Sequence, residues 1–182
     1  MCANNEVYLI NEHEAVDLGL PSGLKWASCN IGANSPEEFG NYYAWGETSV
    51  KDHYDITNHF LYDDKCNCLA LTLMGKYYRT GYSRKRYKCG NITTSLIYYT
   101  IYGSDKYDAA RRNWGLDWRL PSPSEFDELI SCCKWIWLNN NEVNGYKVIG
   151  PNGNWIFLPA AGIHHSSHNE SGHYWTGSSK FI

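Results

Sequence analysis

The sequence predicts an α+β fold, with two main helices beside a small, twisted and mostly antiparallel sheet. Three observations support this prediction. Residues 122–133 have the pattern of a capped amphipathic helix, and residues 104–115 carry the start and stop signals of another. Residues 146–158 have the pattern of a β-hairpin. The 182 residues are enough to bury a core, so we expect one domain over residues 1–182.

The N-terminal part of the chain predicts strands first. Residues 7–10 are apolar and predict an edge strand. Residues 15–29 alternate as a strand pair does, and Pro21-Ser22-Gly23 supplies the turn between them. Ser35-Pro36-Glu37-Glu38 predicts one or two helical turns, because proline and acidic residues suit the first turn of a helix. An aromatic cluster follows and ends at a glycine: Tyr42, Tyr43, Trp45 and Gly46.

Residues 49–104 match these patterns poorly and are expected to be an insertion within the domain. They hold half of the Lys and Arg residues, interleaved with tyrosines, a mixture that can contact phosphate or stack on bases. The net charge of −3 argues against a nucleic-acid partner, so we prefer a solvated insertion. Near its end, residues 96–102 are rich in β-branched and aromatic side chains and predict a strand.

Two elements are expected before the second helix. Ser104 is the expected N-cap of a first helix, which should end at Gly115. Residues 118–121 predict a short strand that stops at a proline. This strand should lead directly into the second helix.

The second helix is expected over residues 123–133. Ser122 is its candidate N-cap, Pro123 suits the first helical position, and Glu125 closes a capping box. Four residues follow at helical spacing and predict the buried face: Phe126, Leu129, Ile130 and Cys133.

A hairpin is expected after the helices. Strands at residues 146–149 and 155–158 flank a turn that contains Asn152-Gly153. Asn-Gly between two apolar runs is the strongest short signal for a hairpin. These antiparallel strands complete the small sheet.

Seven cysteines are an odd number, so at least one stays unpaired within the chain. Cys132 and Cys133 point about 100° apart on a helix, which disfavours a bond between them. Cys66-Asn67-Cys68 lacks the two-residue gap of common zinc sites. A disulfide framework is neither excluded nor indicated.

Several blocks of the sequence resemble one protein family. Trp118-Arg119-Leu120-Pro121, followed by a serine-capped helix, is similar to the strand-to-helix corner of C-type-lectin-like folds. The closest match is a bacterial branch of that fold, the Fibrobacter succinogenes major paralogous domain family. The blocks that fit its pattern, in its order, are residues 16–27, 30–33, 40–48, 145–148, 157–162 and 174–178.

This resemblance implies a C-type-lectin-like domain that binds a ligand or is displayed on a surface, without catalysis. Six residues are then expected to belong to the scaffold: Trp26, Trp45, Gly46, Trp118, Arg119 and Pro121. Relatives continue past the Tyr174-Trp175 block into further strands, whereas this chain stops at Ile182. A truncated structural paralogue without a ligand is therefore one alternative.

The expected ligand-binding surface is the loop from His164 to Trp175, because loops on a rigid scaffold often carry binding residues. The candidates are His164, His165, His168, His173, Tyr174 and Trp175. Imidazoles at this spacing can bind zinc or copper, but the Ser, Asn and Gly around them predict a flexible loop. We therefore expect no metal site. An unknown glycan, peptide or protein is the expected partner.

Two better-known activities of this fold fit the residues less well. Calcium-dependent lectins use Glu-Pro-Asn or Gln-Pro-Asp with Trp-Asn-Asp, and none of these triplets occurs here. The second alternative is an oxidoreductase of the formylglycine-generating type, which resembles this chain at Arg119-Leu120-Pro121-Ser122. Such enzymes need reactive thiols or an iron site, and Cys132 and Cys133 lie on a helix. We expect no catalytic residue and no cofactor.

The compartment is left open by the residues. No apolar run approaches the roughly 18 residues that a membrane span needs. The N-terminus lacks a signal peptide, and residues 1–5 suit either a cytoplasmic start or the lipid-bearing cysteine of an exported lipoprotein. The family resemblance implies an extracellular or cell-surface location.

Overall fold

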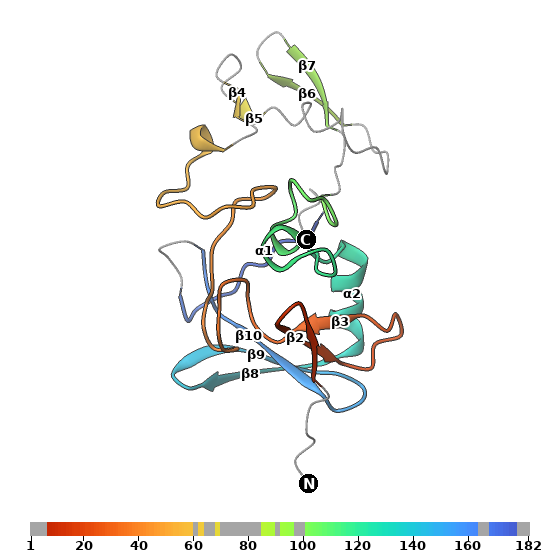
Figure 1. The fold of residues 1–182 in the computed structure, drawn as a ribbon. Helices are drawn as coiled ribbons and strands as arrows, with labels where there is room; N and C mark the ends of the chain where they lie inside the picture. The colour runs from red at the N-terminus through yellow and green to blue at the C-terminus, as the bar shows by residue number, and fades with distance from the viewer. Residues whose placement is uncertain are drawn as a thin grey trace.

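The computed structural model describes residues 7–59, 62–63, 68–69, 85–89, 92–96, 101–163 and 168–177. Over these residues the chain is an α+β protein, with two three-stranded antiparallel sheets and two α-helices (Figure 1). The predicted α+β class with two main helices is confirmed. The backbone between residues 49 and 104 contains a short 3₁₀ helix and two small antiparallel pairs: Ile56–Asn58, β4 (Tyr62–Asp63) with β5 (Cys68–Leu69), and β6 (Lys85–Cys89) with β7 (Ile92–Leu96).

The first sheet consists of β1 (Val7–Ile10), β2 (His13–Asp17) and β3 (Lys25–Ala27), in the order β1-β2-β3. It confirms the predicted edge strand and the predicted hairpin. Asn11 and Glu12 connect β1 to β2, and both have positive φ, of 48° and 68°. Two central residues with positive φ define a type I′ turn, whose twist matches that of the flanking strands.

The second sheet consists of β8 (Lys134–Asn140), β9 (Val143–Ile149) and β10 (Trp155–Pro159), in the order β10-β9-β8. The hairpin of β9 and β10 was predicted and is confirmed. Strand β8 was not predicted, since its continuous apolar run follows a helix without Gly or Pro between them. Asn141 and Glu142, with φ of 48° and 67°, form a second type I′ turn at its end.

Helix α1 (Ala109–Trp114) begins later than the sequence predicts. Ser104 is not its N-cap: its Oγ accepts backbone N–H groups of Lys106 and Tyr107 in a separate turn. Asp108 is the N-cap, because its buried carboxylate accepts the N–H of Arg111 at 3.1 Å. The predicted end of the helix at Gly115 is confirmed.

Residues 118–121 are not in a β-strand, so the predicted strand is wrong. Their hydrogen bonds go to loops and side chains instead. The N–H of Leu120 donates to the carboxylate of Asp108, and the carbonyl of Pro121 accepts the N–H of Gly177 at 2.7 Å. A corner anchored in this way needs no partner strand.

Helix α2 (Pro123–Cys132) has the predicted start, with Ser122 as N-cap, a complete capping box and a proline in the first turn. Its predicted buried face is partly wrong. Leu129 is fully buried, whereas the side chain of Ile130 is 48% exposed. The buried side is centred on Leu129 and turns toward Cys132 and Cys133, away from Ile130.

Two further predictions fail locally. Residues 35–38 form a single turn, with Glu38 N–H donating to Ser35 O, and no helix. The side chain of Glu38 accepts the N–H of Asn34 within the same turn, whereas Glu37 makes a tertiary contact by accepting from the side-chain amides of Asn140 and Asn141. Of the predicted strand at residues 96–102, β7 includes residue 96, residues 97–100 lie outside the described residues, and residues 101–102 are not in a strand.

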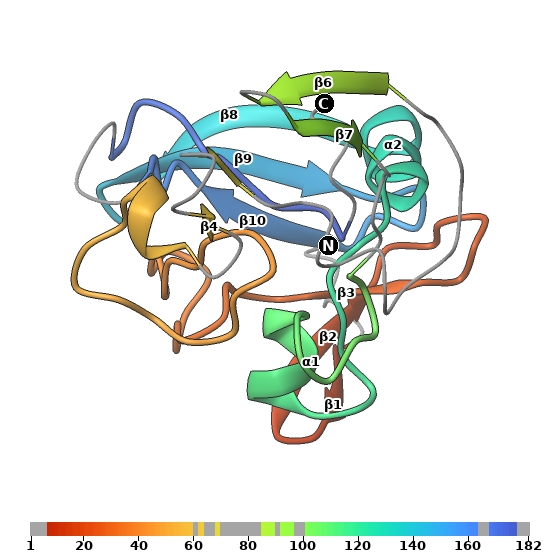
Figure 2. The same ribbon diagram turned by 90° about the horizontal axis from the view of Figure 1, so that it is seen from above.

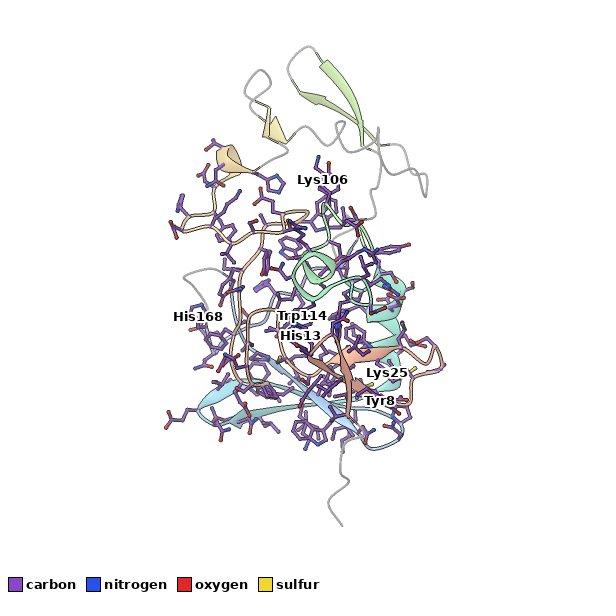
Figure 3. All side chains as sticks on the ribbon, in the orientation of Figure 1. Tyr8, His13, Lys25, Lys106, Trp114 and His168 are labelled. Carbon is purple, nitrogen blue, oxygen red and sulfur yellow. The ribbon has the colours of Figure 1, made fainter. Side chains whose placement is uncertain are left out.

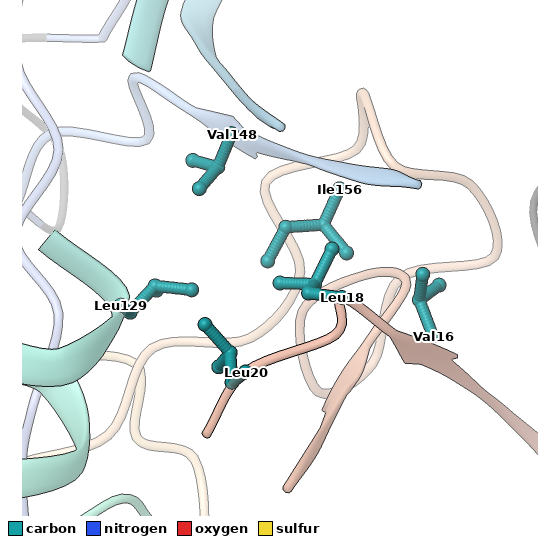
Figure 4. Close-up of a cluster of buried hydrophobic side chains, with 6 residues drawn as sticks. All are labelled: Val16, Leu18, Leu20, Leu129, Val148 and Ile156. Carbon is teal, nitrogen blue, oxygen red and sulfur yellow. The ribbon is translucent and has the colours of Figure 1, made fainter. Parts of the chain in front are cut away.

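The main core joins the two sheets through α2. Seen from above, α2 lies at one end of the β8–β10 sheet, and α1 lies beside β1 and β2 (Figure 2). The core cluster draws on β2 and the chain after it, on α2 and on two strands of the second sheet (Figure 4): Val16, Leu18, Leu20, Leu129, Val148 and Ile156. A second cluster packs α1 on the first sheet through Ala15, Ala110, Trp114 and Trp118.

Candidate functional site

The segment from residue 168 to residue 177, here called the C-terminal loop, is held by backbone hydrogen bonds along its length. Near its start, Asn169 N–H donates to Ala160 O at 2.8 Å, and Gly162 N–H donates to Ser171 O at 2.6 Å. At its end, Gly177 accepts a hydrogen bond from Ile101 N–H at 2.7 Å. The composition predicts a flexible loop, but it cannot reveal these partners at residues 101, 160 and 162.

Two of the predicted ligand residues, His164 and His165, lie outside the described residues. The other four lie in the C-terminal loop. His173 is exposed, with Nε2 at 3.3 Å from Ser171 Oγ. Tyr174 donates its hydroxyl to Pro159 O at 2.7 Å, and burial raises the pKa of Tyr174. Tyr174 therefore secures the loop to the end of β10.

His168 packs against aromatic residues that follow the first sheet. Its Nε2 lies 3.1 Å from the hydroxyl of Tyr42, and its ring centroid lies 5.0 Å from that of Phe39. The Tyr42 hydroxyl donates its proton to Ala161 O at 2.6 Å, so in this contact the Nε2–H of His168 is the donor. His168 stands at the edge of the molecule in Figure 3, with an exposed side chain.

Trp175 is both anchored and exposed. Its indole Nε1 donates to Tyr43 O at 2.8 Å, while 45% of the residue remains accessible to solvent. Next to it, Thr176 is buried and its carbonyl accepts the indole N–H of Trp45 at 3.1 Å. These two indole hydrogen bonds join the C-terminal loop to residues 43–45. The ring of Trp175 is thereby held in one place at the surface.

The predicted scaffold residues make intramolecular contacts. Trp118 is buried, its Nε1 donates to Ile10 O at 3.0 Å, and it packs beside Trp114, which is labelled with His13 in Figure 3. Trp26 is half-buried and contacts the ring of Phe126 edge-on. Gly46 has a φ of 79°, in the left-handed region that glycine favours.

A second exposed aromatic group lies on β8 and β9, and the sequence analysis did not identify it. Trp137 is 45% exposed and Tyr146 is 41% exposed. They are direct cross-strand partners, with ring centroids 4.9 Å apart and planes inclined at 71°. The signal was present in the alternation of Trp135 and Trp137 along β8, but only the register places them next to Tyr146.

Three cysteines have the chemistry of structural thiols. Cys29, Cys132 and Cys133 are free and half-buried. Burial raises the pKa of the Cys29 and Cys133 thiols. A higher pKa leaves less thiolate, the reactive form. Among the described residues, no group of three or more His, Cys, Asp or Glu side chains is placed to hold a metal ion.

None of the described helices is long and apolar enough to cross a membrane. Comparison of the chain with protein-family models, with curated proteins and with solved structures gives no match.

Proposed function

We propose that this chain is a non-catalytic ligand-binding module of C-type-lectin-like fold, which recognises its ligand through the C-terminal loop. The observation that carries the proposal is that Trp175 is both hydrogen-bonded and exposed. Its indole N–H is bonded to Tyr43 O, yet 45% of the residue is exposed. A large ring that is already fixed loses little side-chain entropy when a ligand covers it.

The surroundings of Trp175 support a recognition surface. His168 and His173 add exposed imidazoles on the same loop, and each can donate or accept hydrogen bonds. The loop is tied to β10 through Tyr174 and to the preceding chain through Trp45. Binding residues on a loop that a scaffold positions are a common arrangement in proteins.

The C-type-lectin-like assignment rests on the order of the sequence blocks and on the contacts of the Trp118–Ser122 corner. This corner joins the C-terminal loop to helix α2, since Pro121 O accepts the N–H of Gly177. In the proposed arrangement the corner is structural and the loop is free to vary. Surface display outside the cell is the location that the resemblance implies.

The test is to probe the purified chain on a glycan microarray and on a peptide microarray. Trp175→Ala should lower the bound signal about tenfold, the loss typical of an aromatic anchor. Leu116→Ala is the matched control, because Leu116 is a large apolar residue outside the loop that is 67% exposed. His168→Ala and His173→Ala should weaken binding by smaller factors.

Thermal unfolding of each variant separates binding from folding. Trp175→Ala should keep a cooperative transition, with a midpoint lowered by no more than about 4 °C, which corresponds to one lost hydrogen bond. Binding that survives in Trp175→Ala would contradict the proposal. So would a loss of binding that simply follows a loss of folded protein.

A further inference from the structure

The β8–β9–β10 sheet carries three successive rows of side chains on one face. Directly paired residues of antiparallel strands share a face, and so do residues two positions apart. The first row packs into the core: Trp135, Val148 and Ile156. The second row contains Trp137 and Tyr146. The third row consists of Asn139 and Asn144, whose side chains are bonded at 2.9 Å.

The exposure of the face changes from row to row. Val148 is fully buried, whereas Trp137 and Tyr146 in the second row are 45% and 41% exposed. Asn139 in the third row is also exposed. We name Trp137, Tyr146, Asn139 and Asn144 the aromatic platform. Its side chains lie next to the core but are not covered by it.

The indole of Trp137 is exposed, and its N–H has no acceptor in the described part of the chain; Trp26 Nε1 also lacks one, but it is buried. Four indole N–H groups in the structure each donate to a backbone carbonyl, those of Trp45, Trp118, Trp135 and Trp175. The Nε1 of Trp137 has no such acceptor among the described residues, and neither the Tyr146 hydroxyl nor Asn139 Oδ1 has a partner there. The platform therefore offers two aromatic rings together with a donor and an acceptor that the described residues leave for a ligand.

The angle between the rings shapes the site. With planes inclined at 71° and centroids 4.9 Å apart, Trp137 and Tyr146 form a corner. A ligand ring can stack on one aromatic face while its edge touches the other. A flat, extended surface such as a crystalline fibre does not match a corner. A single ring of a soluble chain-like ligand matches it.

The charge of the platform selects among ring-shaped ligands. None of its four side chains is charged, and Lys147, which follows Tyr146 in β9, is directed over the ring of Trp155 at 4.0 Å. A nucleic acid needs cations near its phosphates, so it is poorly matched here. Pyranose sugars are neutral, and their C–H groups carry a partial positive charge that suits the negative face of an aromatic ring. Their hydroxyls can pair with amides, indole N–H and phenol groups.

From this arrangement we infer that the aromatic platform binds one pyranose unit of a neutral oligosaccharide. The sugar stacks in the corner of Trp137 and Tyr146, and its hydroxyls pair with Asn139 and with the two polar ring groups. Two exposed rings are far less than the roughly 800 Å² per partner of a stable protein interface, so a second copy of the chain is the weaker fit. Asn144 of the platform is bonded to Asn169 of the C-terminal loop, whereas Trp175 of that loop is anchored to Tyr43. Variants at Trp137 and at Trp175 therefore test the two aromatic surfaces separately.

The experiment is isothermal titration calorimetry of the full chain with cellohexaose, xylohexaose and mannohexaose, each up to about 5 mM, which reaches weak affinities. Trigalacturonate serves as an anionic comparison. We expect at least one neutral oligosaccharide to bind and trigalacturonate not to bind. Trp137→Ala and Tyr146→Ala should each weaken binding about tenfold or more. Tyr146→Phe, which keeps the ring, should have a smaller effect, and Leu116→Ala should have none.

Several outcomes would overturn the inference. One is the absence of binding by all three neutral oligosaccharides to protein that unfolds cooperatively. Another is unchanged affinity in both Trp137→Ala and Tyr146→Ala. A loss seen in Trp175→Ala but not in Trp137→Ala would place the sugar on the C-terminal loop instead. Concentration-dependent dimerisation in sedimentation velocity that Trp137→Ala abolishes would show that a second copy covers the platform.

Discussion

Arg119 and Glu125 form a bidentate ion pair across the corner that leads into helix α2. The Nη1–Oε2 distance is 2.8 Å and the Nη2–Oε1 distance is 2.6 Å. The same carboxylate accepts the N–H of Ser122 at 2.8 Å, so it both closes the capping box and binds the guanidinium of Arg119. The guanidinium also lies 5.5 Å from the ring centroid of Tyr102. Glu125 thus links the helix start to Arg119, and Arg119 extends the contact to Tyr102.

The Arg119–Glu125 pair makes stability depend on pH. The hydrogen bonds from Arg119 lower the pKa of Glu125 from 4.5 to about 2. A carboxyl whose pKa is lower in the folded state than in the unfolded state stabilises the folded protein at pH values above the unfolded pKa. This contribution is lost as the pH falls through the folded pKa. The loss should therefore occur between about pH 4.5 and pH 2. Glu125→Gln should lower the free energy of unfolding at pH 7 by about 2 kcal/mol, since the pair is partly exposed.

Urea unfolding at pH 7, pH 4 and pH 3 measures this dependence. The difference in stability between wild type and Glu125→Gln should shrink as the pH falls. Asp127→Asn is the matched control on the same helix, because Asp127 is exposed and makes no hydrogen bond or ion pair to the described residues. A gap between wild type and Glu125→Gln that stays constant from pH 7 to pH 3 would contradict the assignment.

Asp108 should be intolerant of its closest analogue, asparagine. It is fully buried, and its two oxygens accept N–H groups from Gly103, Arg111 and Leu120. Either orientation of an asparagine side chain places its NH₂ group against a backbone donor. We expect Asp108→Asn to cost about 2–4 kcal/mol of unfolding free energy. Asp105→Asn breaks only an exposed pair with Arg111 and should cost about 0.5 kcal/mol or less. Equal costs in chemical denaturation would refute the buried role of Asp108.

The β8–β9 turn offers a stabilising substitution. Glu142 has a φ of 67° at the second central position of a type I′ turn, where glycine is preferred. Glu142→Gly should raise the free energy of unfolding by about 0.5–1 kcal/mol, because glycine has no Cβ to oppose this conformation. Glu142→Ala keeps the Cβ and is the control, with no gain expected. A melting temperature that rises equally in both variants would assign the effect to the lost charge instead.

Gly150 marks a close contact between the two sheets. A Cβ at this position would collide with the backbone carbonyl of Leu18, which follows β2. Gly150→Ala must separate the chains and should cost more than about 3 kcal/mol. Gly23 is the control: its φ is 71° and nothing lies within 4 Å of its Cβ position, so Gly23→Ala should cost about 1 kcal/mol. Similar unfolding midpoints for the two variants would exclude the contact.

The start of helix α2 was predictable because all its signals are local. Ser122, Pro123 and Glu125 lie within four positions, and the capping box that they predict is present. The start of α1 was predicted wrongly at Ser104 for the opposite reason. Asp108 became the cap because its carboxylate also serves Gly103 and Leu120. Composition and spacing do not reveal which of two acceptors will be buried beside distant N–H groups.

The candidate surfaces, too, could be predicted only where their signals are local. A loop rich in His, Ser and Asn was visible in the sequence, but its anchoring through Trp175 to Tyr43 was not. The platform of Trp137 and Tyr146 was missed because strand β8 itself was missed. Once β8 is placed, the register alone brings the two rings into contact.

By itself, the sequence determined the α+β class, the hairpins on either side of the helices and the cap of α2. These features depend on hydrophobic period, turn residues and capping residues, which act over a few positions. The tertiary structure decided which acid is buried, where the 118–121 segment finds its hydrogen bonds and which aromatic rings remain exposed. Those outcomes depend on contacts that range from Leu120 with Asp108, 12 positions apart, to Trp175 with Tyr43, 132 positions apart. Burial and hydrogen-bond satisfaction are properties of the packed chain.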